Sequence, residues 1–139
     1  MSYAWPYKIE VYSPNGDLLR RFARKAPFFD VQKKDSLGNL NYCGSSQQVA
    51  WLPDGNIINM TREWTGQGES RADMKNHLDL FDEKGTYLLT AASSDIFEPE
   101  DSFNVGELAA DSQGNIWIVN NDPFPHIVKY KIEIVDLKK

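Results

Sequence analysis

Hydrophobic and polar residues alternate with a period of two in several segments of the chain. In the first such segment, the apolar side chains of Tyr7, Ile9 and Val11 fall on one face of an extended chain. Residues 77–82 repeat this alternation, and no segment has the 3.6-residue period of an amphipathic helix. A period of two is typical of a β-strand that is buried on one side. The pattern therefore predicts an all-β protein built from antiparallel strands.

Turn signals pair these strands into hairpins. Asn15-Gly16 tolerates positive φ at both positions, which predicts a tight turn within residues 7–22. Pro53-Asp54-Gly55-Asn56 plays the same role in the next hairpin, where Pro53 suits a turn better than a central strand. The predicted strand-bearing segments are residues 7–22, 47–61, 77–90, 107–119 and 126 to about 134. The predicted loops are residues 44–46, 62–76 and 91–105.

The hairpins also repeat in sequence. Gly55-Asn56-Ile57 recurs as Gly114-Asn115-Ile116. Self-similarity of this kind indicates a modular array, and a module of four strands made only of hairpins is the pattern of a β-propeller blade. The fourth strand of the last blade is missing from this assignment. The assigned parts are two strands of one blade (residues 7–22), a complete blade (47–90) and three strands of another (107–134).

These repeated segments resemble the NHL-type, six-bladed β-propeller family. The similar segments are Val49–Ile57 and Leu108–Ile118, with the turns Tyr12–Gly16 and Phe81–Gly85. The resemblance implies a propeller fold, of which residues 1–139 would form a single partial domain. The family often has Val-x-Asp where this chain has Asn59-Met60-Thr61 and Val119-Asn120-Asn121. The motifs are short, and they concern the fold rather than the function.

About two blades do not cover their own apolar surface. Each blade buries its faces against its neighbours, so an isolated pair exposes two apolar sheet faces. Three interpretations remain open. The chain is a fragment whose remaining blades belong to a longer chain, three copies form a trimer that completes six blades, or the chain has a different small all-β fold.

Size and charge exclude several classes of partner. The chain has 139 residues, the length of one domain, and a formal net charge of -5, which makes it a poor partner for nucleic-acid phosphates. No apolar stretch approaches the roughly 20 residues needed to span a bilayer, so we expect no membrane partner. Met1–Pro6 lacks the features of a signal peptide. The single cysteine, Cys43, excludes an internal disulfide and a metal site built on cysteines.

Three residues are candidate ligand-binding side chains. His77 and His126 open equivalent strands of their blades, where imidazoles could act as ligands or bases, although both could also simply begin a strand. Trp64 lies in a predicted polar loop, where its ring could bind a sugar or a peptide. Trp51 and Trp117 lie in predicted strands, so we expect them to pack between blades.

Two sets of oxygen-bearing residues could hold a divalent ion such as Ca²⁺. The first set flanks the hairpin turns, although tight turns require the same residue types. It consists of Asp54, Asn56, Asp111 and Asn115. The second set follows from a similarity to sugar-lactonase-like propeller enzymes, which bind a divalent ion through Glu, Asn and Asp from separate blades. The conceivable members here are Glu107, Asn120 and Asn121.

These observations favour a β-propeller segment that acts as a ligand- or protein-binding or scaffolding module. No catalytic residue is assigned, because the sequence contains neither a glycine-rich phosphate loop nor a nucleophile elbow. The predicted loops 62–76 and 91–105 are the expected binding segments. The alternative is that the chain forms part of a propeller hydrolase or lactonase with a divalent metal in its channel.

Overall fold

The computed structural model describes residues 7–29, 32–34, 40–42, 44–64, 74–97, 105–120 and 124–132. Within these residues, every regular element is a β-strand except for two short 3-10 turns, η1 (Pro27–Phe29) and η3 (Ser93–Asp95). No helix in this part of the chain is long and apolar enough to cross a membrane. The prediction of an all-β protein with antiparallel strands is confirmed.

The described strands form four antiparallel sheets, in each of which successive strands pair. The N-terminal hairpin consists of β1 (Ile9–Tyr12) and β2 (Leu18–Phe22), and a small hairpin consists of β3 (Gln32–Lys34) and β4 (Leu40–Tyr42). The central sheet contains β5 (Gly44–Trp51), β6 (Ile57–Trp64), β7 (Met74–Phe81) and β8 (Tyr87–Ala92). The C-terminal sheet contains β9 (Val105–Ala110), β10 (Asn115–Asn120) and β11 (His126–Lys131).

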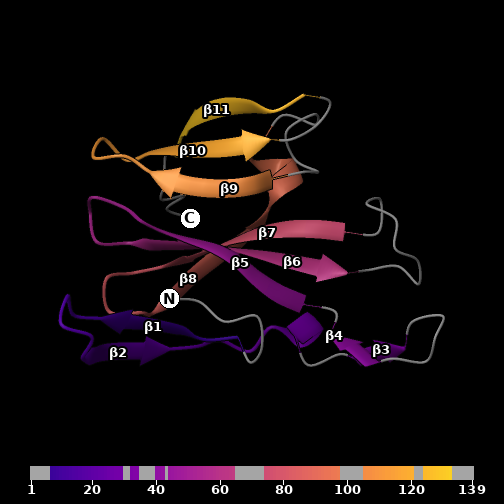
Figure 1. The fold of residues 1–139 in the computed structure, drawn as a ribbon, viewed down its shortest axis with the longest axis horizontal. Coiled ribbons are helices and arrows are strands. Elements are labelled where there is room, and N and C mark those ends of the chain that lie inside the picture. The colour runs from indigo at the N-terminus through magenta and orange to yellow at the C-terminus, as the bar shows by residue number, and fades with distance from the viewer. Residues whose placement is uncertain are drawn as a thin grey trace, which may run out of the picture.

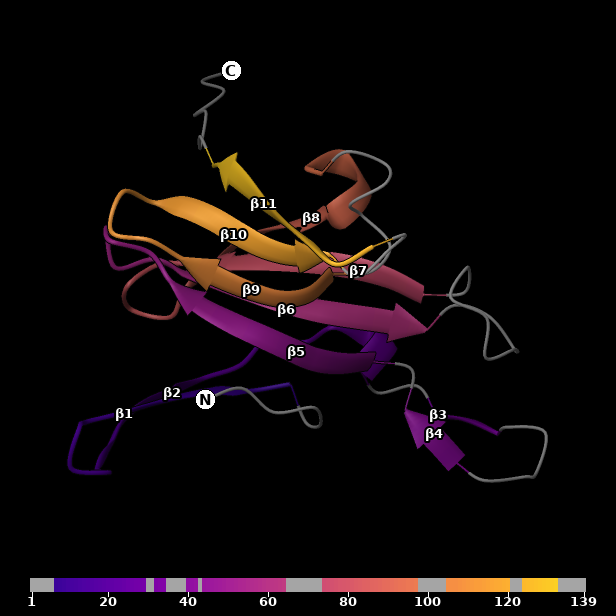
Figure 2. The same cartoon turned by 45° about the horizontal axis from the view of Figure 1, so that its top comes forward.

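Three of these sheets lie in layers that follow their order in the chain (Figures 1 and 2). In Figure 2 the orange C-terminal sheet lies above the magenta central sheet, and the indigo N-terminal hairpin lies below it. β5 contacts β9, so the first strands of the central and C-terminal sheets meet. On the other side, η1 contacts β5 and β6. The central sheet is therefore covered on both faces.

The side chains of β6 are buried on both faces of the central sheet. Ile58 and Met60 pack in the core beneath the C-terminal sheet, whereas Ile57, Asn59 and Thr61 alternate with them and face the N-terminal hairpin. All five are 2% exposed or less. Because neither face meets solvent, the alternation of apolar and polar residues in β6 does not separate buried from exposed positions.

Two cores hold the layers together by hydrophobic burial. The core between the central and C-terminal sheets contains Ala50, Leu52, Ile58, Met60, Leu78, Leu80, Phe97, Leu108, Ile116 and Ile118. The core between the N-terminal hairpin and the central sheet contains Tyr7, Ile9, Ala26, Phe29, Ile57 and Phe81. In the second core the ring of Tyr7 packs edge to face against Phe29, with 4.7 Å between ring centroids.

The repeated hairpin turns adopt the same conformation. Gly55 has a φ of 87° and Gly114 a φ of 81°, in the left-handed region that favours glycine. The amide of Gly55 donates to the carbonyl of Leu52 at 3.0 Å, and that of Gly114 donates to the carbonyl of Asp111 at 3.1 Å. The repeated Gly-Asn-Ile motif therefore encodes a repeated turn.

The central sheet is longer than the sequence predicts. Residues 44–46 belong to β5, so the loop predicted there is wrong. β6 continues to Trp64 and β7 begins at Met74, so both ends of the loop predicted over 62–76 are wrong as well. Polar side chains pair across the strands in this extension, as where Arg62 Nε donates to Asn76 Oδ1 at 3.0 Å. Such cross-strand bonds stabilise a strand whose sequence alone does not alternate. The part of the predicted loop between β6 and β7 lies outside the described residues.

Candidate functional site

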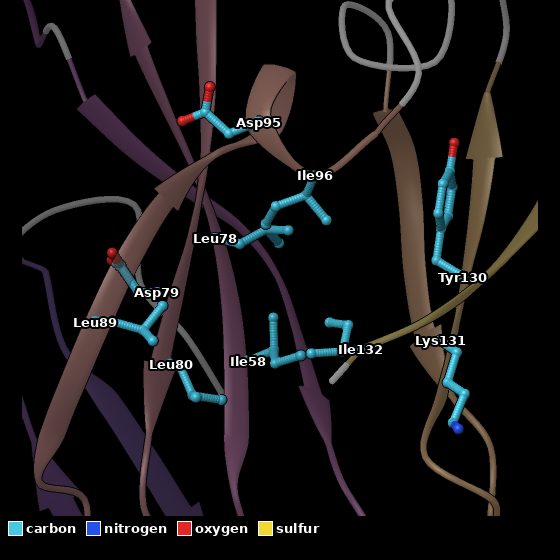
Figure 3. Close-up of a pocket in the computed structure, with 10 residues that line it drawn as sticks. All are labelled: Ile58, Leu78, Asp79, Leu80, Leu89, Asp95, Ile96, Tyr130, Lys131 and Ile132. Carbon is cyan, nitrogen blue, oxygen red and sulfur yellow. The ribbon is translucent and has the colours of Figure 1, made fainter. Parts of the chain in front are cut away.

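An open cleft of about 500 Å³ separates β8 of the central sheet from β11 of the C-terminal sheet (Figure 3). Aliphatic side chains form most of its lining, with Leu78 and Leu80 from β7, Leu89 from β8 and Ile132 beyond the end of β11. Its size and apolar lining are typical of sites that bind ligands. This cleft is the candidate binding site.

The walls of the cleft follow from the strand register. Leu89 lies opposite Leu80 in the β7–β8 pair, so both side chains face the C-terminal sheet. Leu80 is buried, but Leu89 is 43% exposed because it borders the open cleft. On the other wall, the ring of Tyr130 packs against Phe97 with 4.8 Å between centroids.

Charged groups lie at the ends of the cleft rather than in its middle. Asp95 of η3 stands at one end and Lys131 of β11 at the other (Figure 3). Asp79 also borders the cleft, but its carboxylate binds side chains on the opposite face of the central sheet. The middle of the cleft therefore suits an apolar ligand group, because a polar group placed there would have few hydrogen-bond partners.

The C-terminal sheet presents a second exposed surface, of mixed apolar and charged side chains, on the side away from the central sheet. We call this surface the forward face, and its residues are Glu107, Ala109, Trp117, Val119, Ile127, Lys129 and Lys131. Trp117 is 38% exposed and Ile127 is 67% exposed. Lys129 Nζ lies 5.1 Å from the centroid of the Trp117 ring, a cation–π distance.

Strand register relates the forward face to the core. In the central sheet the cross-strand pairs are Ile58 with Leu80 and Met60 with Leu78. At the same places after the shared Gly-Asn-Ile turn, the C-terminal sheet pairs Trp117 with Lys129 and Val119 with Ile127. Positions that are buried between the central and C-terminal sheets thus recur one sheet later on the forward face.

A buried polar cluster joins the N-terminal hairpin to the central sheet. Its centre is Asp79, which is 0% exposed. The Asp79 carboxylate accepts hydrogen bonds from Tyr7 Oη at 2.6 Å and from Arg24 Nη2 and Nε at 2.8 and 3.1 Å. It also accepts a hydrogen bond from Thr90 Oγ1. Tyr7 Oη in turn accepts from Asn59 Nδ2 at 3.0 Å.

The protonation states in this cluster are fixed by burial and by the Asp79 carboxylate. Burial, reinforced by the nearby Asp79, raises the pKa of the Tyr7 phenol, which stays neutral and keeps donating. Burial lowers the pKa of Arg24, but its bonds to Asp79 outweigh this effect and raise that pKa overall. Four donors occupy the two carboxylate oxygens, so the cluster acts as a structural joint between layers.

The two predicted ligand histidines occupy equivalent strand positions in different environments. His77 lies opposite Thr61 in the β6–β7 pair, and His126 lies opposite Asn120 in the β10–β11 pair. His77 is half-buried, with Nε2 3.0 Å from Glu63 Oε2. His126 is exposed, and its Nδ1 lies 2.7 Å from a main-chain carbonyl two residues earlier. Neither histidine lines the cleft.

The tryptophans differ from their predicted positions. Trp64 is the last residue of β6 and is half-buried, so it does not lie in a loop. Trp51 is 46% exposed and borders a cavity of about 360 Å³ between β1 and β5. Trp117 is exposed on the forward face, where its Nε1 donates to Asp111 Oδ2 at 2.9 Å. Neither of the last two rings is enclosed between layers. Trp51 lies on a face of the central sheet that the N-terminal hairpin covers only in part, and the described residues place no sheet over the forward face.

The first set of predicted ion ligands forms hydrogen bonds within the hairpin turns. Asp54 Oδ1 accepts from the amide of Asn56 at 3.0 Å. Asn115 Nδ2 donates to both carboxylate oxygens of Asp111, at 3.0 and 2.8 Å. The hydrogen bonds from Asn115, followed by that from Trp117, lower the pKa of Asp111 below its ordinary value. These carboxylates are therefore acceptors within their own turns.

The second set of predicted metal ligands is divided between two faces. Glu107 is exposed on the forward side of β9, whereas Asn120 is buried on the opposite side of β10. Asn121 and Cys43 lie outside the described residues. In the part of the chain that the structure covers, no three His, Cys, Asp or Glu residues gather where they could hold a metal ion. The divalent-ion site stays a prediction.

Sequence analysis missed both the cleft and the buried polar cluster. Asp79 lies between Leu78 and Leu80 in an alternating segment, and the sequence analysis assigned no role to it. A sequence signal was available in Glu10, an acidic residue that precedes Gly16 by the same interval as Asp79 precedes Gly85. Glu10 is buried as well, at 1% exposed. Part of the predicted binding loop 91–105 does border the cleft, through η3 and the residue after it, while residues 98–104 lie outside the described ranges.

Comparison with known proteins finds no matching family model and no curated protein of similar sequence.

Proposed function

We propose that this chain is a segment of a β-propeller-like array that acts as a binding or scaffolding module. Its three layers would be successive blades, the forward face would receive a further sheet, and the cleft would bind a ligand. The observation that carries this proposal is the recurrence of buried core positions on the forward face. Terminal repeats ordinarily carry a polar outer face, whereas this face keeps the apolar side chains of Trp117, Val119 and Ile127 beside its charged residues.

A further sheet on the forward face would cover two large apolar side chains. Trp117 and Ile127 are 38% and 67% exposed on the forward face. Covering apolar area is worth about 25 cal/mol per Å², so a further sheet on this face would be stabilised by the same force that holds the first three layers. The sheet would come from a longer chain or from a second copy, as in a trimer that completes six blades.

The polar groups of the described layers also suit a scaffold. Asp79 and Arg24 pair between two layers, and Glu10 pairs with Arg21 within the N-terminal hairpin. These charged groups fix the arrangement of strands, while most of the cleft and part of the forward face present apolar side chains. A surface of this kind binds by shape and burial, which favours a binding role.

The test combines solution mass with one substitution on the forward face. We expect the 139-residue chain to associate in light scattering, or to bind a hydrophobic fluorescent dye as a monomer. Ile127→Lys should reduce either signal without changing the circular dichroism spectrum, because Ile127 is largely exposed. Leu88→Lys is the matched control, since Leu88 is 47% exposed on β8 and outside the forward face. A monomer that binds no dye, or an equal response of the two variants, would overturn the proposal.

A further inference from the structure

The two ends of the cleft between β8 and β11 carry opposite charges. Asp95 lies at one end and Lys131 at the other (Figure 3). The side chains between them include Leu78, Leu80 and Ile132, which are aliphatic. A molecule with an apolar body would therefore meet a charged group at either end of the cleft, and the sign of its own charge would determine its orientation.

Asp95 is held in position by its neighbours in the chain. It is the last residue of η3, which contacts β7. Ser93 and Phe97 on either side of it are each 4% exposed, and the amide of Phe97 donates to the carbonyl of Ser93 at 2.8 Å. The Phe97 ring also packs against Tyr130 on the opposite wall. A carboxylate placed on such an anchored turn loses little conformational freedom when it binds a ligand.

The Asp95 carboxylate is available to a ligand, whereas the other charged groups of the cleft are engaged. Asp95 is exposed, and within the described residues its carboxylate forms no hydrogen bond or ion pair. Asp79 accepts several hydrogen bonds on the opposite face of the central sheet, and Lys131 has a further interaction within the protein. The net charge of -5 also attracts cations to the molecule as a whole.

We propose that the cleft binds a small amphiphile with a protonated amine at one end. The apolar body of this ligand lies between β8 and β11, where it covers Leu89, which is 43% exposed. The amine lies at the η3 end of the cleft and donates to the Asp95 carboxylate. This inference rests on the proposed function, in which the cleft binds a ligand, and it names the class of that ligand.

The apolar body and the amine contribute differently to binding. Each methylene group that the cleft removes from water should raise the affinity about fourfold. An ion pair with an exposed carboxylate such as Asp95 should add only about twofold to fivefold, because water screens it. The aliphatic walls therefore supply most of the affinity, and Asp95 supplies the preference for a cation over a neutral or an anionic ligand.

The probes are octylammonium, octanol and octanoate, which share one apolar chain and differ in charge. Each is titrated into the full chain below its micelle-forming concentration, and binding is followed by the NMR shifts of leucine and isoleucine methyl groups. We expect octylammonium to bind more tightly than octanol, and octanol more tightly than octanoate. Hexylammonium should bind more weakly than octylammonium, by about fourfold for each methylene lost. Tighter binding of octanoate than of octylammonium, or no saturable binding of octylammonium, would overturn the proposal.

Two pairs of variants separate the charge from the apolar wall. Asp95→Asn should weaken octylammonium about twofold to fivefold and leave octanol unchanged. Its control is Glu107→Gln, which makes the same change in net charge at an exposed carboxylate on the forward face. Leu89→Asn should weaken all three probes, because it places a polar group in the wall, whereas Leu88→Asn at a leucine outside the cleft should not. An equal response of octylammonium and octanol to Asp95→Asn would show that Asp95 does not bind the amine.

The outcomes separate this inference from the proposed function. Ile127→Lys, which tests the forward face, should leave octylammonium binding intact, because Ile127 lies on the side of β11 away from the cleft. If the full chain does not bind octylammonium, the inference is wrong, while association through the forward face would survive that result. If octylammonium binds but Ile127→Lys and its control Leu88→Lys respond equally in the association assay, the forward-face proposal is wrong and the cleft ligand stands.

Discussion

The hydroxyl of Tyr7 should contribute measurably to the stability of the fold. It donates to Asp79 Oδ2 at 2.6 Å and accepts from Asn59 Nδ2 at 3.0 Å, and the residue is 4% exposed. Tyr7→Phe removes both hydrogen bonds while keeping the ring that packs against Phe29. The variant therefore isolates the polar contribution of the joint between the N-terminal hairpin and the central sheet.

The expected cost of Tyr7→Phe follows from the partners that remain. A hydrogen bond to a charged group contributes about 1.5–3 kcal/mol, and a buried donor left without a partner costs about 1–3 kcal/mol. Asp79 keeps Arg24 and Thr90, and Asn59 keeps the bond that its Oδ1 accepts from Ser46 at 2.8 Å. These remaining bonds moderate the loss, so we expect a decrease of about 2 kcal/mol in the free energy of unfolding.

The assay is urea unfolding followed by circular dichroism, with Tyr12→Phe as the matched control. The Tyr12 hydroxyl also donates to a carboxylate at 2.6 Å, that of Glu10, but Tyr12 is 39% exposed. Water can replace an exposed hydroxyl, so the control should lose less than about 1 kcal/mol. Equal losses in the two variants, or a loss below about 0.5 kcal/mol for Tyr7→Phe, would refute the assignment of the cluster as a structural joint.

Two further predictions concern alkaline pH and one hairpin turn. Folding raises the pKa of Tyr7 above its ordinary value of 10.0. The stability that comes from the neutral phenol is therefore complete below that pH and is lost as the pH rises above it. The urea concentration at the unfolding midpoint should fall between about pH 8 and pH 11, and it should fall less in Tyr7→Phe. Gly85→Ala should destabilise the protein by about 1–3 kcal/mol more than Gly16→Ala, because both glycines have positive φ but only at Gly85 would the new Cβ lie 2.7 Å from the Phe22 ring. Thermal unfolding of the two glycine variants checks this, and equal melting temperatures would contradict the packing argument.

The hairpins could be predicted from sequence because their determinants are local. Gly55 and Gly114 each adopt a positive φ that glycine tolerates best, and an Asp–Asn pair supplies side-chain hydrogen bonds within each turn. The alternating strands on either side need no information from elsewhere in the chain. The all-β class and the antiparallel pairing of successive strands follow from these short segments.

The buried polar cluster could not be predicted because its partners are distant in sequence. Tyr7 and Asp79 are separated by 72 positions. Alternation in β7 indicates that Leu78 and Leu80 share a face, and the ordinary inference is that Asp79 meets solvent. That inference fails because the N-terminal hairpin covers this face, and a carboxylate there must then find donors.

The sequence predicted the cleft only in part. The assignment of three strands to residues 107–134 predicted an unfilled fourth position, but not its consequence for the neighbouring sheet. That consequence depends on layer stacking, which leaves Leu89 of β8 43% exposed opposite Tyr130. The predicted ligand residues Trp64, His77 and His126 were chosen for their chemistry, and none of them lines the cleft.

The two interfaces of the central sheet are stabilised differently, one by buried hydrogen bonds and the other by aliphatic packing. On the N-terminal side, Asn59 and Asp79 form a cross-strand pair that hydrogen-bonds Tyr7. At the corresponding place in the C-terminal sheet, the pair is Ile118 and Val128. A hydrogen-bonded joint fixes one arrangement, since each donor needs its acceptor, whereas aliphatic surfaces accept many apolar shapes. The interface between the central and C-terminal sheets should therefore tolerate exchanges among Val, Ile and Leu better than the hydrogen-bonded joint on the other side.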